Sequence, residues 1–112
     1  MDITGTWHMI EMETWDEDSL NMEVRAYIRI ERKGDGEFHF GQVQAGIVGR
    51  VEDHIRGKRF EFTFEGCDEN DQVSGRGWIE LTGKDTIMGE FIFHNGDSSR
   101  FDAERRVVNR MD

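Results

Sequence analysis

Three phenylalanines separated by single polar residues restrict the fold of this chain more than any other feature. Phe60, Phe62 and Phe64 alternate with charged or hydroxyl-bearing residues in the segment 59–65. A period of two places all three rings on one face of a β-strand, whereas a helix would scatter them around its circumference. Burial of each ring contributes about 1.5–3 kcal/mol, so the segment strongly favours one strand register.

Segments with the same alternation recur along the chain. The first begins at Gly5, and the others cover 26–31, 38–40, 47–51, 59–65, 77–81, 87–93 and 101–105. Glycines within these patterns fit the bends of a small closed sheet. About eight strands at a spacing near ten residues predict an all-β fold, a single antiparallel up-and-down β-barrel formed by residues 1–112. A barrel is favoured over a sandwich because closure removes exposed strand edges.

Two stretches lack this alternation and are expected to connect strands. Residues 67–74 are polar and predict an extended connection. Residues 16–24 predict a loop or a single helical turn, because Asp16 or Asp18 can cap a helix there.

The composition disfavours several classes of protein. A net charge of −10 over 112 residues repels phosphate backbones, which argues against nucleic-acid binding. The single cysteine, Cys67, excludes an intrachain disulfide. No apolar run approaches the roughly 20 residues of a membrane-spanning helix, and the first residues do not resemble a signal peptide. We therefore expect a soluble, cytoplasmic protein without a membrane partner.

The first strand contains a conflict between alternation and burial. If Trp7 points inward, strict alternation also sends Glu11 and Glu13 inward, at a cost of several kcal/mol if they lack partners. A β-bulge after Trp7 resolves the conflict, and we prefer this interpretation because bulges are common at barrel rims. The alternative is a polar interior in which Glu11 or Glu13 is a cavity carboxylate with a perturbed pKa.

Gly5-Thr6-Trp7 near the N-terminus and Arg105 in the last strand resemble the arrangement found in calycins, which include lipocalins and fatty-acid-binding proteins. In those barrels the tryptophan packs at the closed end and the late arginine lies across its ring. The resemblance implies that Gly5, Trp7 and Arg105 form a structural plug at one end of the barrel. A cation over an indole face contributes about 0.5–2 kcal/mol.

A longer resemblance covers nearly the whole chain. The segments that carry it are Trp15-Asp16-Glu17-Asp18, Phe40-Gly41-Gln42-Val43, 64–71, 74–78 and 94–103. They are similar to the recurring segments of a family of small uncharacterised bacterial proteins with a calycin-like barrel. The resemblance implies this fold and a polar cluster, and it implies no reaction. Gln72 departs from the pattern, since a proline is expected at that position of the loop.

The polar cluster comprises acidic residues around one predicted turn together with groups from later strands. Its members are Glu65, Asp68, Glu69, Asp71, Arg76, His94 and Asp97. A run of carboxylates can bind Ca²⁺ or Mg²⁺, but the spacing does not match an EF-hand loop. A solvated hairpin with Arg76 paired to a carboxylate is the preferred interpretation, so no metal site is predicted. The four histidines show no zinc-ligand spacing.

Three functional hypotheses remain open at this point. The first is a barrel that binds a small apolar or amphipathic ligand through its aromatic residues, namely Trp15, Phe40, Phe62, Phe64, Phe91 and Phe93. The second is a non-enzymatic interaction or structural protein with a filled core, acting as a homo-oligomer or a partner-binding module. Its aromatic anchors would be Trp15, Tyr27 and Trp78. Ile79 and Leu81 lie opposite Trp78 in the alternation, so one face of this strand is apolar beyond the core or covered at an edge, which suggests a homo-oligomer.

The third hypothesis is an enzyme that uses the carboxylates and His94 for acid–base chemistry. Neither a nucleophile elbow nor a catalytic spacing supports it, so we predict no catalytic residue, and the sequence identifies no cofactor. His94 and Asp97 are instead expected to hold the last hairpin through side-chain hydrogen bonds. Ligand binding is the leading hypothesis.

Overall fold

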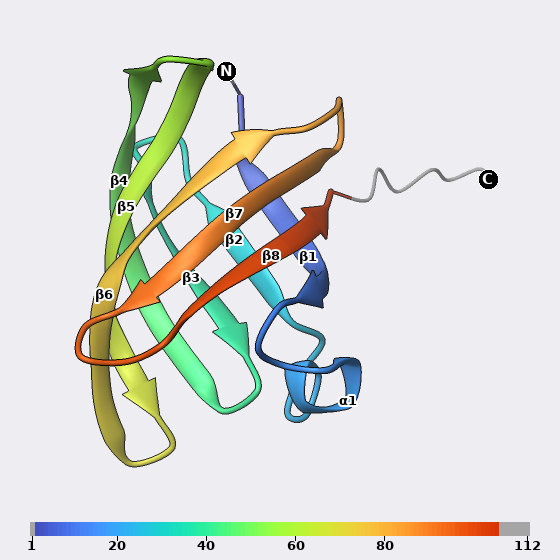
Figure 1. Ribbon diagram of the computed structural model, residues 1–112, viewed down its shortest axis with the longest axis vertical. Coiled ribbons are helices and arrows are strands. Elements are labelled where there is room, and N and C mark those ends of the chain that lie inside the picture. The colour runs from blue at the N-terminus through green and yellow to red at the C-terminus, as the bar shows by residue number, and fades with distance from the viewer. Residues whose placement is uncertain (1, 106–112) are drawn as a thin grey trace, which may run out of the picture.

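The computed structural model describes residues 2–105, which form one closed antiparallel barrel (Figure 1). The elements are β1 (Gly5–Met12), α1 (Glu17–Leu20), β2 (Tyr27–Ile30), β3 (Asp35–Phe40), β4 (Val43–His54), β5 (Gly57–Asp68), β6 (Asp71–Leu81), β7 (Thr86–Phe93) and β8 (Ser98–Glu104). Each strand pairs with the next, and β8 returns to pair with β1. The predicted up-and-down barrel of eight strands is therefore confirmed.

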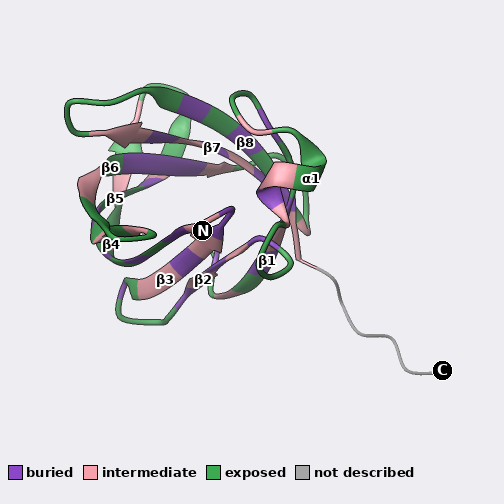
Figure 2. Cartoon of the chain, turned by 90° about the horizontal axis from the view of Figure 1, so that it is seen from below, coloured by how far each residue is buried: buried purple, intermediate pink, exposed green. Residues whose placement is uncertain are grey.

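Alternation along the strands separates the core from the surface. Phe60, Phe62 and Phe64 are at most 4% exposed, whereas the residues between them on β5 face solvent. The same division runs around the barrel in Figure 2, where buried and exposed residues alternate along several strands. Burial of the apolar face of each strand thus sets which face of the sheet turns inward.

The polar stretch 67–74 is not a long loop, and that expectation was wrong. β5 continues to Asp68 and β6 begins at Asp71, so a tight turn joins two paired strands. Cys67 pairs with Gln72 in this hairpin, and Gly66 pairs with Val73. Backbone pairing continues here although few side chains are apolar, because the ladder hydrogen bonds do not depend on side-chain polarity.

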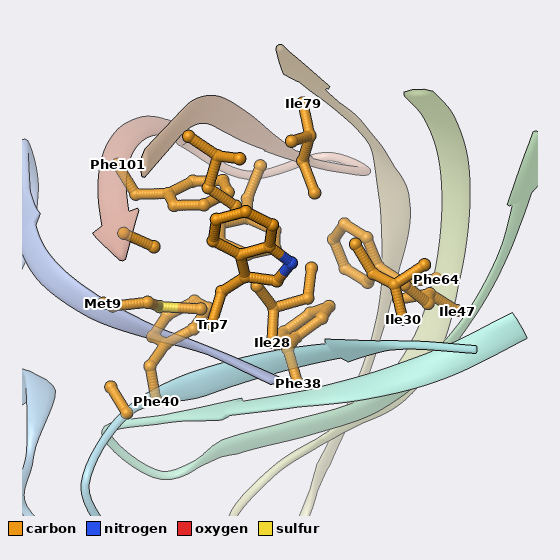
Figure 3. Close-up of a cluster of buried hydrophobic side chains, with 14 of the residues drawn as sticks. Trp7, Met9, Ile28, Ile30, Phe38, Phe40, Ile47, Phe64, Ile79 and Phe101 are labelled. Carbon is orange, nitrogen blue, oxygen red and sulfur yellow. The ribbon is translucent and has the colours of Figure 1, made fainter. Parts of the chain in front are cut away.

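Aromatic rings fill the centre of the barrel (Figure 3). Phe91 is fully buried, and its ring centroid lies 4.5 Å from that of Phe38 and 4.6 Å from that of Phe101. Phe62 and Phe64 approach the same ring edge-on at 6.0 and 6.2 Å. Edge-on and offset contacts of this kind are favourable, so the rings form a packed core and do not surround an open interior.

One end of the barrel is closed by Trp7. Its side chain is fully buried, and the indole Nε1 donates a hydrogen bond of 2.8 Å to the carbonyl oxygen of Ile3. The guanidinium of Arg105 lies 4.4 Å from the centroid of this ring and donates to the carbonyl oxygen of Thr4. Gly5 has a φ of +125°, which a larger residue rarely adopts. The structure therefore places Gly5, Trp7 and Arg105 together at this end.

A β-bulge interrupts β1 after Trp7, as preferred above. The register against β8 shifts between Met9 and Glu11, which leaves Ile10 as the extra residue. Met9 and Met12 are buried, whereas Glu11 and Glu13 are exposed. The alternative of a polar interior lined by these two glutamates is therefore wrong, because the bulge turns them to solvent.

The short helix α1 forms at the opposite end of the barrel, within the stretch expected to hold a loop or one turn. Asp16 is its N-cap and accepts a hydrogen bond of 2.9 Å from the backbone N–H of Ser19, which holds the pKa of this carboxyl below its ordinary value. Leu20 is fully buried, and its carbonyl oxygen accepts from the N–H of Gly41 in the β3–β4 turn. This helix is the longest among residues 2–105, and it is too short to cross a membrane.

Trp78 and Ile79 lie on opposite faces of β6. Ile79 belongs to the core, whereas Trp78 points outward and is still only 8% exposed. The guanidinium of Arg59 covers its ring at 4.1 Å, and Glu90 accepts a hydrogen bond from its Nε1. Side chains of the same chain therefore cover Trp78, and its burial requires no second subunit.

The side-chain pair between Tyr27 and Glu37 predicts a measurable shift on the outer face of β2 and β3. The hydroxyl of Tyr27 donates to the carboxylate of Glu37, and this bond raises the pKa of Tyr27 above its ordinary value. Tyr27 is the only tyrosine in the sequence, so tyrosinate absorbance during an alkaline titration reports on this group alone. We expect a midpoint above about 10 in the folded protein.

The variant Glu37→Gln is expected to move that midpoint down, and Glu61→Gln on the outer face of β5 is the control that leaves it unchanged. Because folding raises this pKa, the bond stabilises the fold fully below the unfolded value and loses its effect as the pH rises through the folded one. An identical midpoint in the Glu37 variant and the parent protein would contradict the assigned cause.

Candidate functional site

The end of the barrel opposite Trp7 holds an open cleft of about 510 Å³, which we call the mouth cleft. It lies between the β5–β6 and β7–β8 turns, beside Trp15, which comes just before the N-cap residue of α1. Its lining residues are Trp15, Val43, Asp68, Gln72, Val73, Ser74, Phe93, His94, Asn95, Gly96 and Asp97. Segments far apart in sequence thus meet at one rim.

Half-buried apolar side chains form the inner wall of the mouth cleft. Trp15, Val73 and Phe93 pack against the core but retain partial exposure. The ring of Trp15 contacts Phe40 edge-on with centroids 5.0 Å apart, and its centroid is 6.2 Å from that of Phe93. Phe93 in turn meets Phe64 at 5.2 Å. The wall is therefore continuous with the rigid aromatic core behind it.

Hydrogen bonds from neighbouring strands position Trp15. The N–H of Thr14 donates to the Ser99 hydroxyl at 3.1 Å, and the Thr14 hydroxyl donates to the carbonyl oxygen of Ser98. Ser99 is fully buried, so its bond ties the exposed Thr14 to the interior side of β8. Trp15 follows directly and precedes the N-cap Asp16, which places the indole between the end of β1 and α1.

Backbone groups, and not the side chains of His94 and Asp97, make the hydrogen bonds that hold the β7–β8 turn within the described residues. The N–H of Phe93 donates to the carbonyl oxygen of Asp97, and the N–H of His94 donates to that of Ser74 at 2.7 Å. The expectation of side-chain hydrogen bonds was therefore wrong. Both side chains are exposed at the rim, where they are accessible to a ligand.

The structure divides the predicted polar cluster into separate parts. Asp68, His94 and Asp97 line the mouth cleft, whereas Glu69 in the β5–β6 turn and Asp71 at the start of β6 are exposed outside it. Glu65 and Arg76 belong to a second open cleft of about 790 Å³ on the outer face of β4–β7. His94 borders both clefts. Arg76 lies in mid-strand and forms no ion pair with a described residue, so its predicted pairing with a carboxylate was wrong.

The aromatic residues predicted to contact a ligand also divide into two groups. The side chains of Phe40, Phe62, Phe64 and Phe91 are buried in the packed core. Trp15 and Phe93 alone of the six retain partial exposure, and both line the mouth cleft. The sequence did not predict Val73 as a lining residue, because it is a single apolar residue among polar ones. Its two-residue spacing from Gly75 and Gly77 was the available signal, since this spacing places it on the inward face of β6.

The chemistry offered by the mouth cleft is a combination of aromatic stacking and acidic or neutral polar contacts. The carboxylates of Asp68 and Asp97 can accept hydrogen bonds, while Gln72 and Ser74 can donate or accept. Among residues 2–105, no group of three or more histidine, cysteine, aspartate or glutamate side chains is arranged to hold a metal ion. The lining therefore offers an aromatic surface beside side chains that can form hydrogen bonds.

The class that the fold defines is a small closed barrel of eight antiparallel strands with an aromatic-filled interior. No family model, curated protein or solved structure matches the chain.

Proposed function

We propose that the protein binds a small amphipathic ligand in the mouth cleft. The observation that carries this proposal is the half-buried wall of Trp15, Val73 and Phe93 beneath a polar rim. A volume of about 510 Å³ falls within the range of small-molecule sites, which are mostly apolar and carry a few polar groups. Covering the exposed part of these side chains would provide the hydrophobic driving force for binding.

The filled core supports a ligand position at the end of the barrel and not in its centre. The ring of Phe91 lies in the interior with its centroid 4.5 Å from that of Phe38 and 4.6 Å from that of Phe101, so a central ligand would have to displace packed rings. The contact between Trp7 and Arg105 supports the further proposal that the chain belongs with the calycin-like barrels that it resembles. Binding at the mouth would then be a variation on an internal ligand site.

The charge of the rim favours a ligand head group that is cationic or a hydrogen-bond donor. Asp68 and Asp97 face the cleft, and the net charge of −10 extends the negative potential around it. An anionic head group would meet this potential with only His94 as a compensating group in the lining. The proposed ligand therefore has an apolar or aromatic body and an amine or similar donor at one end.

A titration with matched probes tests this proposal. Phenethylamine, phenethyl alcohol and 3-phenylpropanoate share an aromatic body and differ in head-group charge. We expect chemical shift changes at the backbone amides of 72–74 and 93–97, largest for the amine and smallest for the carboxylate. The absence of saturable changes with all three probes would contradict ligand binding at the mouth cleft.

Two neighbouring residues on β7 provide a variant and its control. Phe93 points into the mouth cleft, whereas Ile92 points to the outer face of the same strand. Phe93→Ser is expected to weaken binding of phenethylamine about tenfold or more, because it removes an aromatic wall. Ile92→Ser should leave the affinity unchanged. Equal losses in the two variants would place the site elsewhere.

A further inference from the structure

The mouth cleft shares part of its lining with the second open cleft, of about 790 Å³, on the outer face of β4–β7, which we call the outer cleft. The residues that line both are Ser74, Phe93, His94 and Asn95. The two clefts therefore meet at the rim, where β7 ends at Phe93 and the N–H of His94 donates to the carbonyl oxygen of Ser74. A ligand that crosses this rim can place one end in each cleft.

The two clefts differ in charge. The lining of the mouth cleft contains Asp68 and Asp97 and neither arginine nor lysine. The lining of the outer cleft contains Arg76 and a single acidic residue, Glu65. A groove with carboxylates at one end and a guanidinium at the other is complementary to a ligand that carries a cation at one end and an anion at the other.

The guanidinium of Arg76 is available to such an anion. Among residues 2–105, the Arg76 side chain has no ion pair, hydrogen bond or ring contact, and Glu65 on the neighbouring strand does not pair with it. The other arginines within strands each contact a glutamate or an aromatic ring, and these are Arg29, Arg50, Arg59 and Arg100. The N–H donors of Arg76 can therefore bind a carboxylate.

Strand pairing sets the separation of the two charged ends. Phe93 pairs with Gly75, the residue before Arg76, and the N–H of Phe93 donates to the carbonyl oxygen of Asp97. Asp97 and Arg76 thus lie on opposite sides of β7, with backbones about 10 Å apart, because neighbouring strands are spaced about 4.8 Å apart. Three extended residues of a peptide span a similar length of about 10 Å.

Backbone groups at the start of β6 favour a peptide over other molecules with two opposite charges. Pairing between β6 and β7 begins at Gly75, so β7 offers no pairing residue to 71–73. The carbonyl oxygen of Ser74 points toward β7, where it accepts from His94. Backbone groups alternate in direction along a strand, so the N–H and C=O of Gln72, which lines the mouth cleft, point the same way. They offer one donor and one acceptor to a peptide bond.

We propose that the ligand of the mouth cleft is a short peptide with an aromatic first residue, whose chain crosses the rim and ends with its carboxylate at Arg76. This inference rests on the proposed binding of an amphipathic amine in the mouth cleft and names the chemical class of that ligand. The N-terminal ammonium group is near Asp97, and the aromatic side chain packs against the apolar wall. A peptide with both termini charged has no net charge, so the net charge of −10 does not repel it.

Two peptide probes test this proposal, phenylalanyl-glycyl-glycine and its C-terminal amide, which differ in the charge at the end expected to reach Arg76. Arg76→Gln is expected to weaken binding of the free acid about two- to fivefold, the range of a solvent-exposed ion pair, and not to weaken binding of the amide. Arg50→Gln is the control, because it removes the same charge from the outer face of β4 outside both clefts. It should leave the affinity for the free acid unchanged.

Chemical shift changes in the unsubstituted protein supply a second readout. The free acid is expected to shift the backbone amides of Thr63, Glu65 and Arg76 in addition to those at the mouth cleft, whereas phenethylamine shifts only the latter. Unchanged thermal unfolding of the Arg76 variant controls for folding, since this side chain is exposed.

The outcomes separate this inference from the proposed function. If phenethylamine binds but the free acid shifts no amide of the outer cleft, binding at the mouth cleft stands and the peptide proposal is overturned. Equal losses for the acid and the amide, or in the Arg76 and Arg50 variants, would also overturn the peptide proposal alone. If neither phenethylamine nor either peptide binds, both proposals fail.

Discussion

Replacing Trp7 with alanine is expected to lower the free energy of unfolding by about 3–5 kcal/mol, the largest effect of any substitution considered for this barrel. The indole is fully buried, hydrogen-bonded to the carbonyl oxygen of Ile3 and covered by the guanidinium of Arg105. Its removal leaves a cavity at the closed end and takes away the surface on which Arg105 lies. Urea-induced unfolding followed by circular dichroism measures the change.

Two milder variants separate the volume of Trp7 from its contact with the cation. Trp7→Phe retains a ring but loses the Nε1 donor, and it should cost less than the alanine variant. Arg105→Gln retains the indole and removes the cation over it, which contributes about 0.5–2 kcal/mol in such contacts. If the alanine variant were no less stable than the phenylalanine variant, Trp7 would not act as a plug that fills volume.

Gly77→Ala is expected to destabilise the barrel by about 1–3 kcal/mol, because an inward-facing methyl group at this position has no space. A Cβ atom there would lie 2.4 Å from the carbonyl oxygen of Glu90 and 2.5 Å from Cζ of Phe62. Backbone and a packed ring would both have to move. The same unfolding measurement applies, and a small cost would show that the Phe62 ring can shift without loss.

Gly46 provides the matched control for this effect. It lies in β4 on the outer face of the sheet, and the nearest atom to an added Cβ would be the carbonyl oxygen of Gly36 at 3.8 Å. Gly46→Ala should leave stability unchanged or raise it by about 0.5 kcal/mol, because alanine loses less backbone entropy on folding than glycine. A comparable loss in both variants would indicate a general effect of β-propensity and not a steric clash.

Local patterns were sufficient for some parts of the site and not for others. The alternation on β7 correctly placed Phe93 inward, and the N-cap at Asp16 fixed the position of the turn beside Trp15. Arg76 was grouped with the acidic turn because it is close to it in sequence. Its position in mid-strand on the outer face follows from β6 beginning at Asp71, which side-chain polarity does not reveal.

The bulge in β1 confirms the predicted bulge after Trp7, whose exact position the sequence left open. The cost of burying Glu11 and Glu13 required a shift of register somewhere after Trp7. Pairing with β8 determined where the shift occurs, since Met9 and Met12 must both reach the core from the same strand. A single strand cannot specify this point, because several bulge positions satisfy its own burial pattern.

The sequence by itself determined the all-β class, the number of strands and the inward face of most of them, because a two-residue period is a local property of the chain. Only the tertiary structure decided that aromatic rings fill the barrel, that the apolar wall of the mouth cleft stays half-exposed and that β4 extends beyond its pairing with β3. Those features depend on strand lengths, pairing registers and ring packing across the barrel. They are set by contacts between residues far apart in the chain.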